Sequence, residues 1–162
     1  MQLSESVAAR LRHQHKTIDE LIDGLNEEKL RLRINPAKWS AFENIVHLAA
    51  YQPTFLRRVD SILIDQDEPL FERYVAENDP FFDECRQKPL NKLLYMISSD
   101  RAELLRKLEA LDGNQLSQRG RHQAYGSIPL YRWCDFFLLH EAHHLWTIFQ
   151  LTSVLRTRPQ GF

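Results

Sequence analysis

Four stretches of the chain carry apolar residues at intervals of three or four positions, which is the spacing of one face of an α-helix. They cover about residues 3–25, 40–64, 90–111 and 127–156. A convincing run of alternating apolar and polar residues, as in a β-strand, is missing, and the 162 residues include only five glycines. The pattern predicts an all-α fold, and a four-helix bundle is its simplest architecture.

Local signals predict where these helices begin, end and bend. Ser40 and Glu43 form a capping-box pattern at the start of the second stretch. Pro53 lies inside that stretch, and we expect a kink or local break near Tyr51 because proline lacks an amide hydrogen and clashes with the preceding turn. Residues 127–129 (Ser-Ile-Pro) are expected to open the fourth helix, with the proline in its first turn.

Residues 65–87 differ from the helical stretches and are expected to form one long crossover. In this segment acidic residues are interleaved with Phe71, Tyr74, Phe81 and Phe82, which would anchor it to the bundle. The chain contains neither an internal repeat nor a low-complexity tract, so residues 1–162 are predicted to form a single domain.

Composition and charge exclude several classes of protein. Charged residues nearly cancel to a net charge of −1, so no long-range field would attract nucleic acid or an anionic membrane. Cys85 and Cys134 form no C-x-x-C pattern, which disfavours both a disulfide framework and a thiolate zinc site. Neither a signal-peptide pattern nor a membrane-spanning apolar run is found. We therefore expect a soluble, cytoplasmic protein without nucleic-acid or membrane partners.

Two of the seven histidines, His140 and His144, lie on the apolar stripe of the fourth predicted helix. Side chains four positions apart on a helix are neighbours, so both imidazoles can reach one ion, and imidazole suits zinc, iron, nickel and copper. An inward histidine is more often a core residue bonded to a carbonyl, however. Spacing alone thus leaves a metal site and a structural role equally open.

A third ligand would have to come from another helix, and His47 is the best candidate. It lies one turn after Glu43 and one turn before Tyr51, which are possible partners for orienting its ring. His143 is one step off the inward stripe, so we expect it at the rim of the site or in solvent. His13, His15 and His122 lie on the first helix or in a loop and receive no role.

Residues 140–144 also match the H-E-x-x-H pattern of metalloproteases, in which the glutamate is the general base. The rest of the chain after His144 contains no His, Asp or Glu that could act as a third ligand. Glu141 points about 100° away from His140 around a helix. A protease of the usual kind is therefore not expected.

Two segments resemble the DinB-like superfamily of four-helix bundle proteins, in its YfiT-like branch of metal-dependent hydrolases. Residues 39–48 (WSAFENIVHL) look like the family's tryptophan, capped helix and histidine, and residues 140–148 (HEAHHLWTI) look like its H-x3-H helix. The resemblance covers about 150 residues. It implies a divalent metal, zinc, nickel or iron, bound by His47, His140 and His144, with coordination positions left for water or substrate.

The resemblance also implies a class of reaction, because characterised relatives transfer low-molecular-weight thiols such as bacillithiol or mycothiol, or isomerise or hydrolyse small electrophiles. We expect a metal-dependent hydrolase or thiol S-transferase that acts on a small electrophilic molecule in detoxification or stress response. A non-catalytic protein that sequesters a metal or small ligand is the alternative. A homodimer is a further expectation, because related bundles often dimerise.

The sequence does not choose the general acid or base among Glu43, Tyr51 and Glu141. Trp39 and Trp146 are candidates for lining a pocket, although ordinary packing is the favoured interpretation for both. Residues 65–87 and Pro53 depart from familiar members of the superfamily, and both regions would lie near a substrate. The identity of the substrate therefore does not follow from the resemblance.

Overall fold

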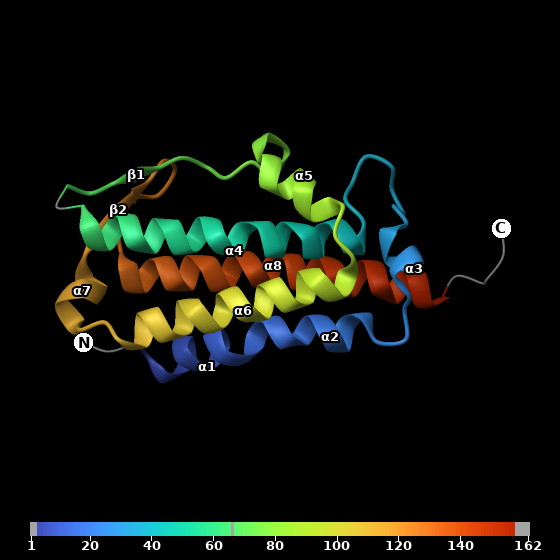
Figure 1. Ribbon diagram of the computed structural model, residues 1–162, viewed down its shortest axis with the longest axis horizontal. Helices are drawn as coiled ribbons and strands as arrows, with labels where there is room; N and C mark the ends of the chain where they lie inside the picture. Colours follow the sequence, from blue (N-terminus) through green and yellow to red (C-terminus); the bar gives the residue numbers. More distant parts are fainter. Residues whose placement is uncertain (1–2, 66, 158–162) are drawn as a thin grey trace.

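The computed structural model describes residues 3–65 and 67–157. Four long helical elements lie side by side in it (Figure 1). They are the pair α1 (Glu5–His13) and α2 (Thr17–Ile22), joined by the 3-10 turn η1 (Gln14–Lys16), then α4 (Ala41–Ile64), α6 (Leu90–Glu109) and α8 (Leu130–Thr157). Helix α4 packs against both α6 and α8. The mostly helical bundle expected from the apolar periodicity is confirmed.

Shorter elements connect the long helices. They are α3 (Glu27–Arg31), β1 (Leu70–Phe71), the 3-10 turn η2 (Ala76–Asn78), α5 (Pro80–Arg86), α7 (Gly113–Ser117), β2 (Arg119–His122) and β3 (Gly126–Pro129). The strands form a sheet in the order β1-β2-β3, in which β1 is parallel and β3 antiparallel to β2. The all-α prediction is therefore only approximate.

The small sheet escaped prediction because its inward positions are not apolar. Burial alternates along β2, but the two buried residues are Gly120 and His122. A Cβ at Gly120 would lie 2.8 Å from a ring carbon of Phe71 and 2.9 Å from a side-chain carbon of Ile62. Glycine is required at this point because β2 lies so close to β1 and α4.

Helix α4 begins and ends close to the predicted positions. The Ser40 hydroxyl accepts from the Glu43 amide, and the Glu43 carboxylate accepts from the Ser40 amide, so the predicted capping box is confirmed. A local break near Tyr51 is absent, because α4 continues through Pro53 to Ile64. Most of the helix is buried, and this packing offsets the one backbone hydrogen bond that proline removes.

Two other predictions about the helices are wrong. The first helix is not continuous, because the η1 turn interrupts it where the side chain of Gln14 donates to the Leu138 carbonyl and to Glu141. Residues 127–129 belong to β3, so the fourth long helix begins at Leu130. The crossover does join α4 to α6, but it contains β1, η2 and α5.

None of the helices in the described part of the chain is long and apolar enough to cross a membrane.

The apolar core is divided into two clusters along the bundle. One cluster includes apolar residues of α4 up to Ala50 and apolar residues of α8 from Leu145 onward. The other takes α4 from Tyr51 and α8 up to Leu138. Polar side chains fill the level between them, namely His47, Arg101, His140, Glu141 and His144. The candidate site therefore lies midway along the bundle.

Candidate metal centre

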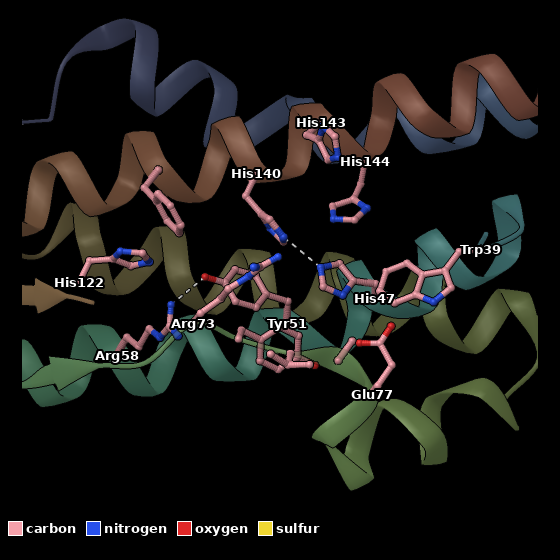
Figure 2. Close-up of a pocket in the computed structure, with 14 residues that line it drawn as sticks. Trp39, His47, Tyr51, Arg58, Arg73, Glu77, His122, His140, His143 and His144 are labelled. Carbon is pink, nitrogen blue, oxygen red and sulfur yellow. Dashed lines mark hydrogen bonds between the residues drawn. The ribbon is translucent and has the colours of Figure 1, made fainter. Parts of the chain in front are cut away.

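His47 on α4 and His140 and His144 on α8 meet in this polar layer. Each of the three offers one ring nitrogen, and these nitrogens all lie within 4.8 Å of one another. The Nε2 atoms of His47 and His140 are 2.9 Å apart. Figure 2 shows the rings of His47 and His140 facing each other, with His144 beside them. The packing of α4 on α8 thus brings together all three residues that the sequence singled out.

Burial keeps these imidazoles neutral. It lowers the pKa of His47 to about 3, that of His140 to about 4 and that of His144 to about 2, and the neighbouring histidines contribute in the same direction. Near neutral pH each ring therefore carries an unprotonated nitrogen with a lone pair. A neutral imidazole is the form that binds a metal.

Asn44 fixes the orientation of one ring. The amide nitrogen of Asn44 donates to the Ser40 carbonyl at 2.8 Å, so the amide oxygen must face His144. That oxygen lies 2.8 Å from Nδ1 of His144 and can only accept, so Nδ1 carries the proton. The Nε2 atom of His144 is therefore the one with the free lone pair.

The donor set fits a divalent metal ion. Bonds of roughly 2.0–2.1 Å from one ion to two imidazoles place their nitrogens about 3 Å apart, close to the separation of His47 and His140. Three imidazoles from two helices can therefore hold an ion, and zinc, nickel and iron all accept such ligands.

The histidines lie in the wall of a cavity of about 400 Å³, formed by α4, α8, the crossover and the β2 strand. The ring of Trp39 lies 5.1 Å from that of His47, and the ring of Tyr51 lies 4.5 Å from that of His140. Residues 73–77 of the crossover close one side of the cavity. A small organic molecule would thus bind between aromatic walls and beside the three imidazoles.

Of the three acid or base candidates, only Tyr51 lines the cavity. Glu43 pairs with Arg33 and Arg86 and lines a different cavity. Glu141 is fully buried and pairs with Arg101. Glu141 is therefore not placed to act as the general base that the H-E-x-x-H pattern suggests.

The remaining sequence candidates have different surroundings. His143 is exposed at the edge of the cavity, as expected. Trp39 lines the cavity instead of merely packing in the core, whereas the exposed Trp146 is not among the lining residues. His122, which received no role from the sequence, also lines the cavity.

Sequence reasoning missed Asn44, Arg58 and Arg73. The helical spacing contained a signal for the first two, because Asn44, His47, Tyr51 and Arg58 follow one another at intervals of three, four and seven positions on α4. Arg73 belongs to the crossover, and no periodicity places it. Only the path of that segment over the bundle brings its side chain to the cavity.

The fold and the site together define a class of protein, namely a helical bundle with three histidines that can bind a metal between two of its helices. The family model of the DinB superfamily matches residues 10–148, and the chain belongs to that superfamily.

Among solved structures, the chain is similar to YfiT from Bacillus subtilis. The match has a TM-score of 0.79 and 15% identity, and it covers 94% of this chain and 87% of YfiT. That protein is described as a probable metal-dependent hydrolase with an unusual four-helix bundle topology. At this identity the likeness shows a shared fold. A search of curated proteins finds no match.

Proposed function

We propose that the protein holds one divalent transition metal, zinc, nickel or iron, with His47, His140 and His144, and is a metal-dependent hydrolase that acts on a small electrophilic molecule. The observation that carries the proposal is the convergence of three neutral imidazoles within 4.8 Å at the wall of a cavity. Membership of the DinB superfamily and the description of YfiT support it.

Three protein ligands are typical of catalytic rather than structural zinc sites, because they leave a position open. When bound, such an ion supplies Lewis acidity, which acidifies a water molecule or thiol and polarises the bond under attack. The chain's own part is to hold the three imidazoles neutral and correctly turned. Burial does the first, and for His144 the contact with Asn44 does the second.

Tyr51 is the best candidate for a hydrogen-bond donor to the substrate. Burial raises its pKa, so the phenol stays protonated near neutral pH. Its oxygen accepts a hydrogen bond from Arg58 at 3.1 Å, which leaves its own hydrogen free to be donated. An oxygen of the substrate beside the His140 ring would be its acceptor.

A low-molecular-weight thiol is the alternative nucleophile at the same site, and it would make the protein a thiol S-transferase. The cavity of about 400 Å³ favours this as a second candidate, because it offers room for an organic co-substrate. Parallel assays with and without added thiol separate the two reactions. Consumption of the electrophile only when thiol is present indicates transfer. The absence of turnover in a metal-loaded protein would instead favour sequestration of a metal or ligand.

The proposal is tested first by metal content. The untagged protein, purified without nickel chromatography, is analysed by inductively coupled plasma mass spectrometry beside the His140→Ala, His144→Ala double variant. We expect close to one equivalent of a transition metal in the parent and little in the folded variant. A parent that stays metal-free after incubation with zinc or nickel would contradict the metalloenzyme proposal.

A further inference from the structure

Two arginines line the same cavity as the three histidines. Arg58 projects from α4 and Arg73 from the crossover. In the view of Figure 2, Arg58 and His122 lie toward one end of the cavity, Trp39 and Glu77 lie toward the other, and the histidine cluster is between them. Neither arginine has a part in the metal site proposed above.

Arg58 is a buried cation whose hydrogen-bond partners are neutral. The residue is 8% exposed, and it donates to the Tyr51 hydroxyl at 3.1 Å and to the Glu72 carbonyl at 2.7 Å. These contacts use two of its five guanidinium hydrogens. No ion pair within residues 3–65 and 67–157 includes Arg58.

Arg101 is a buried arginine with a structural role in the same chain, and its partners can be compared with those of Arg58. Arg101 is 1% exposed and pairs with the equally buried carboxylate of Glu141. Arg58 instead lies near the rings of Tyr51, Phe71 and Trp133, at 5.5–5.8 Å from their centroids. Aromatic faces attract a cation but do not neutralise it. The charge of Arg58 is therefore left available to a group in the cavity.

Arg73 adds a second positive charge at the cavity. Its side chain is exposed, and the ion pairs of the described residues do not include it. Glu77 is the one carboxylate among the residues that line the described cavity, and it too is exposed. Arg58, Arg73 and Glu77 are the lining side chains with a formal charge, so the charges at the cavity sum to a net positive value.

We propose that Arg58 and Arg73 form an oxyanion subsite that binds the carboxylate or phosphate group of a small organic substrate, so that its electrophilic centre lies beside the three histidines. Guanidinium groups match carboxylate and phosphate oxygens in geometry as well as charge. Tyr51 connects the two parts, since its hydroxyl accepts from Arg58 and its ring lies 4.5 Å from that of His140. The role of the bound molecule as a substrate rests on the proposed function, but the subsite itself does not.

Calorimetric titration of the full-length protein with matched probes tests the subsite. Phenylacetate and phenyl phosphate carry the two oxyanion groups on one ring, and phenylacetamide is the neutral counterpart. Each titration is done as purified and again after treatment with a chelator. The variants are Arg58→Met, Arg73→Gln and, as a charge-matched control outside the cavity lining, Arg121→Gln, each checked for folding by circular dichroism.

We expect at least one anion to bind about tenfold or more tightly than the amide, with or without metal. Arg58→Met and Arg73→Gln should each reduce this preference severalfold, whereas Arg121→Gln should leave it unchanged. Arg73→Gln keeps the test decisive if Arg58→Met fails to fold, because the Arg73 side chain is exposed. Whichever anion binds more tightly identifies the group.

Equal binding of anions and amide would overturn the subsite, as would a preference that both arginine variants retain. A preference for the anions that appears only with metal and is unchanged in both arginine variants would also overturn the subsite, but it would not contradict the proposed hydrolase function. Metal content measured on the same samples separates the two proposals. An arginine-dependent anion preference in a protein that binds no metal would support the subsite and contradict the metalloenzyme.

Discussion

The Nδ1–H of His144 donates a hydrogen bond of 2.8 Å to the amide oxygen of Asn44, and this contact holds the ring. Partners of this kind fix the tautomer and the direction of a metal ligand, and their loss typically weakens metal binding about 10-fold to 100-fold. We expect Asn44→Leu to raise the zinc dissociation constant by that factor, measured by competition with a chromophoric chelator.

Asn44→Asp is the control, because it keeps an oxygen acceptor for His144 and loses only the hydrogen bond that the Asn44 amide donates to the Ser40 carbonyl. The aspartate variant should bind zinc within a few-fold of the parent. If the leucine variant also kept the parent's affinity while remaining folded, the orienting role of Asn44 would be refuted.

His15 is buried in η1, outside the candidate site, and burial lowers its pKa from 6.5 to about 4, with nearby Arg101 adding to the effect. Between these values the unfolded chain takes up a proton that the folded chain does not. The free energy of unfolding must therefore fall as the pH is lowered from 6.5 to 4, by about 3 kcal/mol from this group.

Urea unfolding at pH 7.5 and pH 5 measures this contribution. His15→Phe, which cannot be protonated, should lose less stability over that interval than the parent. His13→Phe, at an exposed position two residues earlier, is the control and should stay close to the parent, because His13 is the smallest of the contributors to the lowered pKa of His15. Parallel pH profiles for the parent and both variants would show that His15 titrates normally.

At the scale of the elements, the interruption between α1 and α2 is tied to α8 and α6 by buried polar contacts. Gln14 donates to the Glu141 carboxylate at 2.9 Å, and Arg101 donates to the same carboxylate and, at 3.3 Å, to the Leu11 carbonyl. Three helical elements thus meet around one carboxylate that has no access to the cavity. Glu141 has a structural role, which explains its place in an H-E-x-x-H pattern without assigning it to catalysis.

Glu141→Gln leaves the Arg101 cation buried without its counter-charge, and we expect it to lower the free energy of unfolding by about 3–5 kcal/mol. The double variant Arg101→Met, Glu141→Gln should recover a large part of that loss, because the unpaired charge is gone. Metal content of the folded single variant should equal that of the parent. A loss of metal with unchanged stability would instead place Glu141 in the site.

At the scale of the whole molecule, an ion held by His47 and the two histidines of α8 would cross-link α4 and α8 between the two apolar clusters. An ion that binds only the folded state raises the free energy of unfolding by about 4 kcal/mol when its free concentration is 1,000 times the dissociation constant. For a chain of this size the melting temperature should rise on the order of 10 °C when zinc is added. Differential scanning calorimetry of the parent and of His47→Ala measures the shift, and the variant should show almost none. A similar rise in both would locate the zinc elsewhere.

Apolar periodicity and local capping signals sufficed for much of this architecture. The four helical stretches, the Ser40–Glu43 capping box and the stripe carrying His140 and His144 depend on residues within a turn or two of one another. Interactions of that range can be predicted from the sequence, because the spacing of residues along a helix determines the face on which each side chain lies. His47 could be named from the sequence, but its distance from the other two could not.

Tertiary packing decided the rest. The break at Gln14 exists because a buried carboxylate on α8 is satisfied there, and α4 continues through Pro53 because the packing around it offsets a lost hydrogen bond. The sheet escaped detection because Gly120 and His122 are its inward residues. The crossover places Arg73 in a cavity with Arg58, Tyr51 and the histidines. These features depend on contacts between residues far apart in the chain, and such contacts form only when the helices pack.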